Sequence, residues 1–329
     1  MSCHRNANGL SGAIIAFLVV FALAGGVRAQ DFGYEGRSGP AHWGEEYARC
    51  TGKHQSPINI NHVSVKQNSY PKLEFHNFNV EPKAMLVTNN GHTVLVKMSF
   101  NEGKAPRVKG GPLAEKSSVG YQFKQFHFHW GENDTVGSED KIDNHAYPAE
   151  LHVVLRNLEY PSFASALGKD HGIAVMAFFF QISSTATGGY SNFTSLLPQI
   201  ERKGQSVKIT RTFPLRQYFS KDLSNYYTYT GSLTTPPCSE EVIWMDFRTP
   251  IDITEKQLNA FRLLTAHDDH LKNNFRPTQP LNDRPVYSNR EEAPLFVDSS
   301  AGERTPHFKT VFLVTLLAVV LKDDDLSEA

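Results

Sequence analysis

The amino-acid sequence predicts a mostly β (α+β) fold in a single domain, and three observations support this prediction. Several segments show apolar residues with a period of two, or in unbroken runs of strand length. Only one segment combines a helix start signal with an apolar stripe. About 260 residues lie between two unusual ends, which is enough for one domain with a sizeable core.

The expected strands are rich in β-branched and aromatic residues. The first, residues 92–100, has high β-propensity. Residues 121–130 alternate between apolar and polar side chains, which is typical of a half-buried strand. Residues 172–182 are almost wholly apolar and indicate a central strand that is buried on both faces. A fourth strand is expected over residues 241–247.

The one clear helix is expected to begin after Thr254. Thr254 and Gln257 have the spacing of a capping box, in which each side chain bonds the backbone of the other residue. An apolar stripe follows at Leu258, Phe261 and Leu264. The prolines at positions 57, 236, 237, 250, 277 and 280 are expected in loops.

Composition and charge suit a globular enzyme. Hydrophobic residues make up 40% of the chain and charged residues 20%, and the formal net charge is −1. The chain has no basic stripe, no low-complexity segment and no internal repeat. These features argue against a nucleic-acid partner.

Three histidines give the strongest functional signal. His127 and His129 are two residues apart in an expected strand, so both side chains leave the same face. His152 lies in a second alternating run, and pairing of the two runs would bring three imidazoles together with an open fourth position, as in a catalytic zinc site. Gln125 and Glu150 share these faces and can accept the second ring N–H of a ligating histidine. The weaker interpretation is a surface H-x-H pair and an unrelated core histidine.

The motifs around these histidines resemble a known family. The sequence contains, in this order, FGYEG, QSPINI, QFHFHWG, GSE, AELH, GSLTTPPC and NNFRPTQPLNDRPV. Over roughly residues 31–290 this set resembles the α-class carbonic anhydrases of the secreted or membrane-tethered type, a family that is itself the standard example of an all-histidine catalytic zinc site. The resemblance implies a large twisted, mainly antiparallel central sheet with a few short peripheral helices, and cis prolines in some loops.

The resemblance also implies a reaction, the reversible hydration of carbon dioxide to bicarbonate and a proton, with one Zn²⁺ per chain. Zinc lowers the pKa of its bound water to near 7, so zinc-bound hydroxide can attack carbon dioxide. Thr234 would accept a hydrogen bond from the hydroxide and donate one to Glu139. His92 would carry the proton away, through water ordered by Tyr34 and Asn90. By the same resemblance, the niche for carbon dioxide is lined by Val154, Val175, Leu233, Thr235, Val242 and Trp244.

Three positions depart from the family pattern without removing a predicted ligand. Leu95 stands where many members have a polar residue of the water network, Asp140 follows Glu139 where histidine is common, and Phe275 replaces a frequent tryptophan. The alternative function is a non-catalytic or partly catalytic extracellular binding or mineral-matrix protein with the same fold. The presence of all three zinc histidines argues against it. Weak esterase activity is expected as a side reaction.

The two ends of the chain predict passage through the secretory pathway. Residues 1–29 have the pattern of a signal peptide, which leaves residues 30–298 as the catalytic domain. In the tail, residues 299–329, small residues, a polar spacer and an apolar run too short to span a membrane resemble a glycolipid-anchor signal. The polar ending DDDLSEA instead suits a free tail, and the two interpretations are about even. The expected protein is extracellular, secreted or tethered, with membrane contact only through this candidate anchor, and its oligomeric state is open.

The mature chain would keep two cysteines, Cys50 and Cys238. Two cysteines in a secreted chain suggest one disulfide, and the resemblance implies that these two pair. Closing so long a loop stabilises the fold by about 5 kcal/mol in the chain-entropy model. Two free buried thiols are the alternative. Asn133 and Asn192 begin N-x-T sequons and are candidate glycosylation sites.

Overall fold

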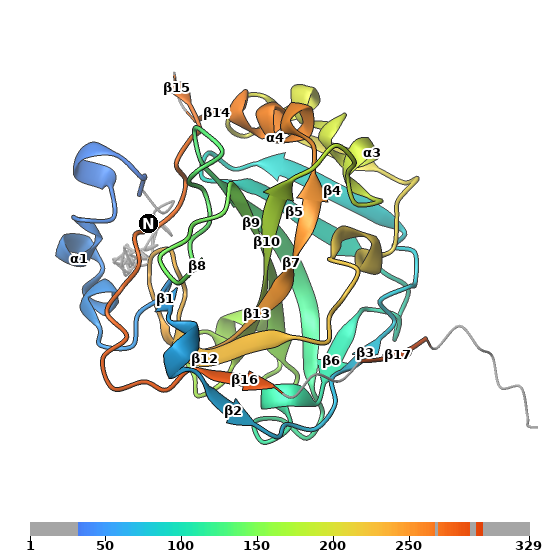
Figure 1. Ribbon diagram of the computed structural model, residues 1–329. Coiled ribbons are helices and arrows are strands. Elements are labelled where there is room, and N and C mark those ends of the chain that lie inside the picture. The colour runs from blue at the N-terminus through green and yellow to red at the C-terminus, as the bar shows by residue number, and fades with distance from the viewer. Residues whose placement is uncertain (1–31, 267–268, 290–293, 299–329) are drawn as a thin grey trace, which may run out of the picture.

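The computed structural model describes residues 32–266, 269–289 and 294–298 (Figure 1). The described residues form one mostly β domain around a 13-stranded sheet. The mostly β prediction is therefore confirmed. The expected signal peptide, residues 1–29, and the expected tail, residues 299–329, lie outside the described residues.

The main path of the sheet runs in the order β11-β4-β5-β7-β9-β10-β13-β12-β16-β2, and β6, β3 and β17 extend a branch from β7. Nine of the strand pairs in this sheet are antiparallel. Three are parallel, namely β10 with β13, β16 with β2, and β17 with β3. The strands are β2 (Lys66–Asn68), β3 (Glu74–His76), β4 (Ala84–Asn89), β5 (Val94–Ser99), β6 (Arg107–Lys109), β7 (Tyr121–Trp130), β9 (Ala149–Asn157), β10 (Ile173–Ile182), β11 (Ser206–Ile209), β12 (Tyr226–Ser232), β13 (Glu240–Ile253), β16 (Tyr287–Asn289) and β17 (Leu295–Val297).

The remaining elements are short and lie around this sheet (Figure 1). Two small sheets pair β1 (Asn59–Ile60) with β8 (Lys141–Ile142), and β14 (Thr265–Ala266) with β15 (Asp269–His270). The α-helices are α1 (Trp43–Glu46), α2 (Phe163–Ala166), α3 (Tyr190–Thr194) and α4 (Glu255–Arg262). The 3-10 turns are η1 (Gly36–Ser38), η2 (Ala48–Thr51), η3 (His62–Ser64), η4 (Gly111–Leu113), η5 (Leu197–Ile200) and η6 (Leu215–Tyr218). Among the described residues, no helix has both the length and the apolar composition needed to cross a membrane.

The expected strands and helix are present, with different boundaries. The expected strand at 92–100 is β5, which begins only at Val94, and the expected helix is α4, which ends at Arg262. Thr254 is the N-cap of α4, and its capping box with Gln257 is complete. The peptide bonds before Pro57 and Pro237 are cis, in agreement with the family resemblance.

The expected loop position of Pro250 was wrong, because Pro250 lies inside β13. Proline cannot donate a ladder hydrogen bond, so a strand tolerates it only where pairing is interrupted. On the neighbouring β10, Phe178 pairs with Phe247 and Phe180 pairs with Ile251, so three residues of β13 stand opposite one of β10. Pro250 belongs to this irregularity, which also explains why the strand extends well beyond the predicted residue 247.

A one-residue bulge in β7 sets which side chains face the candidate site. Phe123 pairs with Leu155 and Gln125 pairs with Val154, so Lys124 has no partner of its own on β9. The bulge reverses the alternation, because an extra residue shifts all later side chains to the other face. The aromatic residues on both sides of it therefore reach the same core, although their positions change from odd to even: Tyr121, Phe123, Phe126, Phe128 and Trp130.

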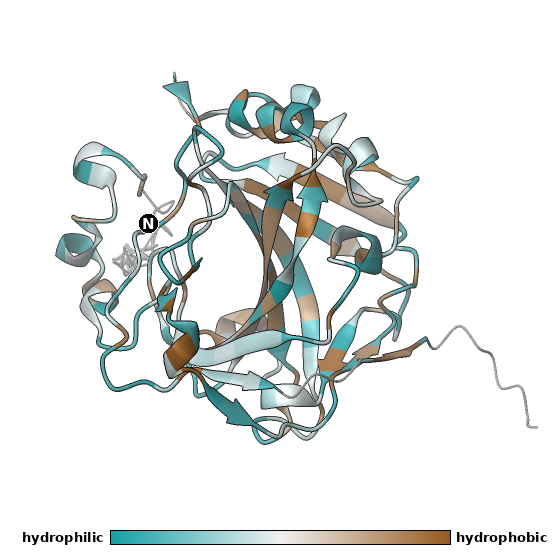
Figure 2. Ribbon diagram, viewed as in Figure 1, coloured by the Kyte–Doolittle hydropathy of each residue, from teal (hydrophilic) through white to brown (hydrophobic). Residues whose placement is uncertain are grey.

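The two faces of the central strands pack differently. One face carries the larger core, to which β10 contributes Met176 and Phe178. The other face carries a smaller apolar cluster, which contains Val175 and Ala177 of the same strand, and this face also bears the histidines. Figure 2 shows the apolar residues concentrated on the central strands and hydrophilic residues on peripheral segments such as β2. Burial on both faces makes the central strands a rigid support for the site.

Candidate metal centre

A row of side chains across four neighbouring strands forms the base of the predicted site. His127 on β7 lies directly opposite His152 on β9, and His152 lies opposite Ala177 on β10. On the other side of His127, its partner is Leu95 on β5. Partners in adjacent strands share a face of the sheet, so these four side chains project to the same side.

The structure brings the three predicted histidines together. One ring nitrogen of His127, one of His129 and one of His152 all lie within 4.8 Å of one another. The ring centroid of His129 is 5.1 Å from that of His127 and 4.5 Å from that of His152. Both His129 and His152 are 1% exposed. The expected pairing of the two runs is thus present, whereas the binding of zinc by these histidines stays a prediction.

The second nitrogen of each ring is held by an acceptor. His127 Nδ1 lies 3.0 Å from Gln125 Oε1, and His152 Nε2 lies 2.8 Å from Glu150 Oε1. His129 Nδ1 lies 2.7 Å from the backbone carbonyl oxygen of Asn274. Each acceptor receives a hydrogen bond from the ring N–H that faces it, so the other ring nitrogen carries the free lone pair. These lone pairs lie on Nε2 of His127, Nε2 of His129 and Nδ1 of His152.

These three lone pairs fit a zinc ion. His129 Nε2 is buried and has no hydrogen-bond partner, which is costly for a polar atom unless a ligand satisfies it. Burial lowers the pKa of His127 and of His152 well below the usual value, and the neighbouring imidazole of His129 lowers both further. His127 and His152 are therefore neutral at pH 7, which is the form that binds metal.

Glu139 and Thr234 lie beside the histidines. Glu139 is 1% exposed, and its Oε1 accepts a 2.7 Å hydrogen bond from the backbone N–H of Arg276. Its Oε2 lies 3.4 Å from His129 Nε2. Burial raises the pKa of Glu139, whereas His129 and the nearby Thr234 hydroxyl lower it. Thr234 is thus close enough to act on Glu139, and the hydrogen bond between them that the sequence resemblance implies stays a prediction.

Comparison with known proteins identifies the family. A family model described as eukaryotic-type carbonic anhydrase matches residues 38–290. The chain is 38% identical to carbonic anhydrase 7 of Homo sapiens over 262 residues, which cover 78% of this chain and 96% of that protein. It is 34% identical to carbonic anhydrase 3 of Equus caballus over 264 residues, which cover 78% of this chain and 98% of that protein.

The chain belongs to the eukaryotic-type carbonic anhydrase family. Its enzyme class is therefore that of the carbonic anhydrases.

The predicted substrate niche of this carbonic anhydrase is one continuous apolar surface. Val154 on β9, Val175 on β10 and Trp244 on β13 are in register across the sheet, next to the histidine row. Val242 and Leu233 join the same apolar cluster. The Trp244 ring stands edge-on to the His152 ring, with 4.9 Å between their centroids. Thr235 is half-buried in the loop after β12.

The residues predicted for proton transfer lie at the turn before β5. The His92 ring stacks on Phe32, with centroids 4.1 Å apart and an interplanar angle of 13°. Asn90 Oδ1 accepts hydrogen bonds from the backbone N–H groups of His92 and Thr93, so its side chain shapes this turn. Burial raises the pKa of Tyr34, and the nearby Glu139 carboxylate raises it further.

Asn274 and Arg276 support the site but were not predicted from the sequence. Besides its carbonyl contact to His129, Asn274 uses its side chain to bond the backbone of Trp130 and His92 at 2.7 and 2.9 Å. The buried Arg276 guanidinium donates to carbonyl oxygens of Cys50 and Ser56 while its backbone N–H holds Glu139. Both residues lie in the motif NNFRP, which was noted only as the end of the family resemblance.

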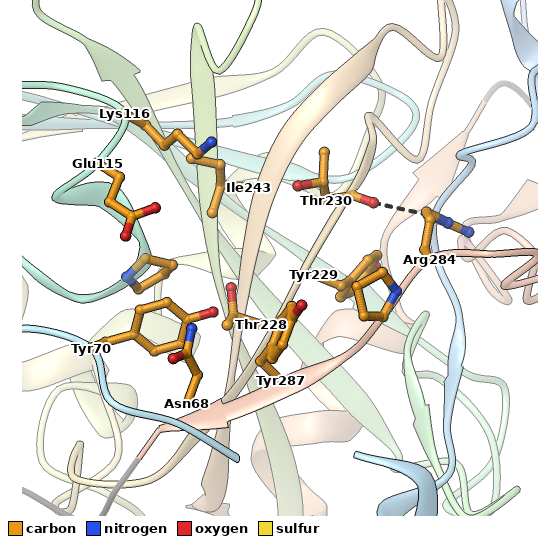
Figure 3. Close-up of a pocket in the computed structure, with 12 residues that line it drawn as sticks. Asn68, Tyr70, Glu115, Lys116, Thr228, Tyr229, Thr230, Ile243, Arg284 and Tyr287 are labelled. Carbon is orange, nitrogen blue, oxygen red and sulfur yellow. Dashed lines mark hydrogen bonds between the residues drawn. The ribbon is translucent and has the colours of Figure 1, made fainter. Parts of the chain in front are cut away.

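A separate cavity of about 290 Å³ lies on another part of the domain (Figure 3). Its lining comes largely from β12, β16 and the segments near them, and it includes Tyr70, Glu115, Lys116 and Tyr287. None of the predicted zinc, catalytic or substrate-niche residues lines it. The cavity therefore plays no part in the site described above.

Replacing Asn274 with alanine is expected to weaken zinc binding about 10- to 100-fold, because supports of metal-ligating histidines have effects of this size. The substitution removes side-chain bonds that fix Trp130 and the turn at His92, and so releases the segment whose carbonyl orients His129. Zinc affinity can be measured by competition with a chromogenic chelator. Asn273→Ala is the matched control, because the only hydrogen bond of the Asn273 side chain among the described residues is the one it accepts from the exposed backbone N–H of Glu132. Equal affinity of the wild type and Asn274→Ala would contradict this role.

Proposed function

We propose that this chain hydrates carbon dioxide reversibly to bicarbonate and a proton, using one zinc ion bound by His127, His129 and His152. The family membership supports carbon dioxide hydration in general. The observation that carries the zinc assignment is the convergence of three imidazole nitrogens, one of them a buried atom without a hydrogen-bond partner. Three nitrogen ligands and an open position are the arrangement of a catalytic zinc.

The protein holds each of the three histidine rings in the orientation that zinc binding requires. When bound, zinc would lower the pKa of a coordinated water molecule to near 7 and so provide the nucleophile. Gln125, Glu150 and the Asn274 carbonyl fix the ring orientations, because each accepts the N–H that does not face the metal. A carboxylate on His152 also raises the basicity of that ligand.

Thr234 and Glu139 would orient the nucleophile. A carboxylate can only accept hydrogen bonds, so Thr234 must donate its hydroxyl proton to Glu139. The hydroxyl oxygen then has lone pairs left, and it can accept a hydrogen bond from the attacking group. The backbone N–H of Arg276 keeps Glu139 in place for this contact. The arrangement selects nucleophiles that still carry a proton.

Carbon dioxide would occupy the apolar surface formed by Val154, Val175 and Trp244, together with Val242 and Leu233. The substrate is small and apolar and needs little polar recognition. Its central carbon is electrophilic, so position relative to the nucleophile is what the site has to provide. Val154 follows His152 by two residues on β9, so the niche side chains form the next row on the face that carries the histidines. This position supports an approach of carbon dioxide to the nucleophile.

Substituting His92 with alanine is expected to lower the steady-state turnover about 10- to 100-fold in weakly buffered solution, because a histidine near its pKa relays protons efficiently. Added imidazole should restore part of the rate. His62→Ala is a control, since the His62 side chain is 59% exposed and lies on η3, away from β5. An unchanged rate in weak buffer would remove His92 from proton transfer.

We also propose that the protein matures in the secretory pathway. The Cys50–Cys238 disulfide is present, as predicted, and disulfides persist in oxidising compartments. Asn133 and Asn192 are both exposed, so the fold leaves room for glycans at either sequon. Expression in eukaryotic cells, followed by N-terminal sequencing and glycosidase treatment of the secreted protein, tests the cut after Ala29 and the use of each sequon. Retention of residues 1–29 would contradict the proposal.

The decisive test of function is stopped-flow carbon dioxide hydration by residues 30–298, with the zinc content of the same sample measured by mass spectrometry. We expect fast hydration at about one zinc per chain, loss with a chelator, and recovery with added zinc. A sample with bound zinc and no hydration would contradict the enzymatic proposal. Active protein without zinc would contradict the metal assignment.

A further inference from the structure

A groove with a volume of about 1080 Å³ is lined by residues of α3 and by the segment that contains the end of β11. We call it the α3–β11 groove. Asn192 and Ser195 line it on one side, and residues 208–213 line it on the other. None of the predicted zinc, catalytic or substrate-niche residues belongs to it. Its volume lies near the upper end of the range of roughly 300–1,000 Å³ that is typical of ligand sites.

The α3–β11 groove combines an apolar floor with a polar rim. Met85, Phe193 and Tyr218 of the floor are each 1% exposed and belong to the larger core. Leu196 and Phe213 are half-buried and pack against the same core. A ligand that fits the groove must therefore offer both apolar surface and hydrogen-bonding groups. The exposed side chains of the rim are Glu81, Ser195, Lys208, Thr210 and Arg211.

The backbone of residues 210–213 offers further polar groups to the groove. β11 pairs only with β4, so its other edge has no neighbouring strand among the described residues. The pairing ends at Ile209, and within the described part of the chain no backbone group of residues 210–213 has a backbone hydrogen-bond partner. Backbone groups of this kind bond water or a ligand. They are available to the hydroxyl groups of a molecule in the groove.

One lining residue of the groove, Asn192, is also the first residue of a glycosylation sequon. The Asn192 side chain is exposed and forms no hydrogen bond among the described residues, so a sugar on its nitrogen displaces no existing contact. Thr194 of the sequon is buried, but glycans are attached before the chain folds. The other sequon differs, because the Asn133 side chain accepts two hydrogen bonds from Thr135 and does not line the groove.

We propose that the α3–β11 groove holds the N-linked glycan of Asn192, with the first sugar units against Leu196 and Phe213. This inference rests on the proposed maturation in the secretory pathway, where such glycans are attached. An N-acetylglucosamine unit has an apolar ring face and an acetyl methyl group, which suit the floor of the groove. Its hydroxyl and amide groups suit the polar rim and the backbone of residues 210–213.

Covalent attachment favours this ligand over a free one. A tethered sugar is present at a millimolar effective concentration, so contacts that would be too weak to hold a free sugar are sufficient. The glycan also covers half-buried apolar side chains that would otherwise face water, namely Leu196 and Phe213. The unfolded chain cannot form these contacts, so the glycan stabilises the folded protein. The proposal does not depend on zinc or on carbon dioxide hydration.

The test compares the full chain expressed in eukaryotic cells as wild type, as Asn192→Gln and as Asn133→Gln, with the glycan at each sequon determined by mass spectrometry. Hydrogen exchange is then followed in peptides that cover residues 206–218. We expect the amides of residues 210–213 to exchange about 5- to 10-fold more slowly in the wild type than in Asn192→Gln. The thermal midpoint of the wild type should be higher by roughly 2–4 °C.

Asn133→Gln is the matched control, because it removes a glycan of the same kind from a residue outside the groove. It should keep the slow exchange of residues 210–213. Enzymatic removal of the glycans from folded wild-type protein is the second comparison, and it should give the exchange rate of Asn192→Gln. This comparison decides the question even if the Asn192→Gln protein does not fold.

Equal exchange with and without a glycan on Asn192 would overturn the proposal and leave secretory maturation intact. A secreted wild type that carries a glycan only at Asn133 would also overturn it, since the groove would then have no tethered ligand. Slow exchange that persists without the glycan and increases with protein concentration would assign the groove to a second copy of the chain instead. Retention of residues 1–29 with both sequons empty would overturn the proposed maturation together with this inference.

Discussion

Replacing His129 with alanine is expected to abolish zinc binding and to lower carbon dioxide hydration at least about 1,000-fold, equivalent to about 4 kcal/mol in the activation barrier. His129 contributes the buried nitrogen that has no hydrogen-bond partner, and this nitrogen lies 3.4 Å from Glu139 Oε2. Its loss leaves two imidazoles, which is too few for a stable catalytic zinc site. Zinc content and stopped-flow hydration on one sample measure both effects.

The control for this substitution is His42→Ala, since the His42 side chain is 46% exposed and, among the described residues, forms an ion pair only with Glu45. It should keep full zinc content and full activity. Far-UV circular dichroism should show that His129→Ala keeps its sheet, because the surrounding strands are held by apolar packing on their other face. A zinc-replete, active His129→Ala protein would refute the metal centre.

The same site predicts how zinc binding depends on pH. Burial lowers the pKa of His127 and His152, so these rings stay neutral when the pH falls through the usual value of 6.5. Protons compete with zinc for these two rings only below the lowered pKa values. Zinc content is therefore expected to remain constant from pH 8 to about pH 6, and to fall only at more acidic pH. Release of zinc already near pH 7 would show that the rings are not buried in solution.

The metal centre could be predicted from sequence to the extent that its parts lie close together in the chain. His127, His129 and Gln125 share a strand, so parity alone places them on one face. Glu150 and His152 share the next strand for the same reason. The third support, the Asn274 carbonyl, lies 145 residues from His129 and is a backbone atom, so no side-chain pattern reports it. The fold places it there.

The fold could be predicted less completely, because local patterns do not reveal how strands are interrupted. The bulge at Lys124 and the irregularity around Pro250 depend on how each strand pairs with its neighbour. The β-propensity of a segment contains no information about this pairing. The buried carboxyl groups of Asp140, Glu150 and Asp246 illustrate the same limit. Asp140 departs from the family pattern, whereas no sequence motif includes Asp246. Only the pairing of β9, β10 and β13 brings Asp246 near Glu150.

Removing the disulfide with the double variant Cys50→Ser/Cys238→Ser is expected to lower the free energy of unfolding by about 3–5 kcal/mol. The two cysteines are 188 residues apart, and the bridge removes much of the freedom of the unfolded chain. Urea unfolding of the oxidised wild type and of the double variant measures the difference. Residues 30–298 of the wild type should show no free thiol when unfolded without reductant. Two titratable thiols would contradict the bridge.

The disulfide also joins two structures that serve the catalytic site. Cys238 ends the loop that carries Thr234, and its backbone N–H bonds the Thr235 carbonyl. The carbonyl oxygen of Cys50 accepts a hydrogen bond from Arg276, whose own backbone N–H holds Glu139. Thr234 and Glu139 are thus each connected to the disulfide. The double variant should therefore lose activity as well as stability, even at temperatures where it stays folded and zinc-replete. Unchanged activity under those conditions would show that the Thr234 loop keeps its position without the bridge, and would limit the disulfide to stabilising the fold.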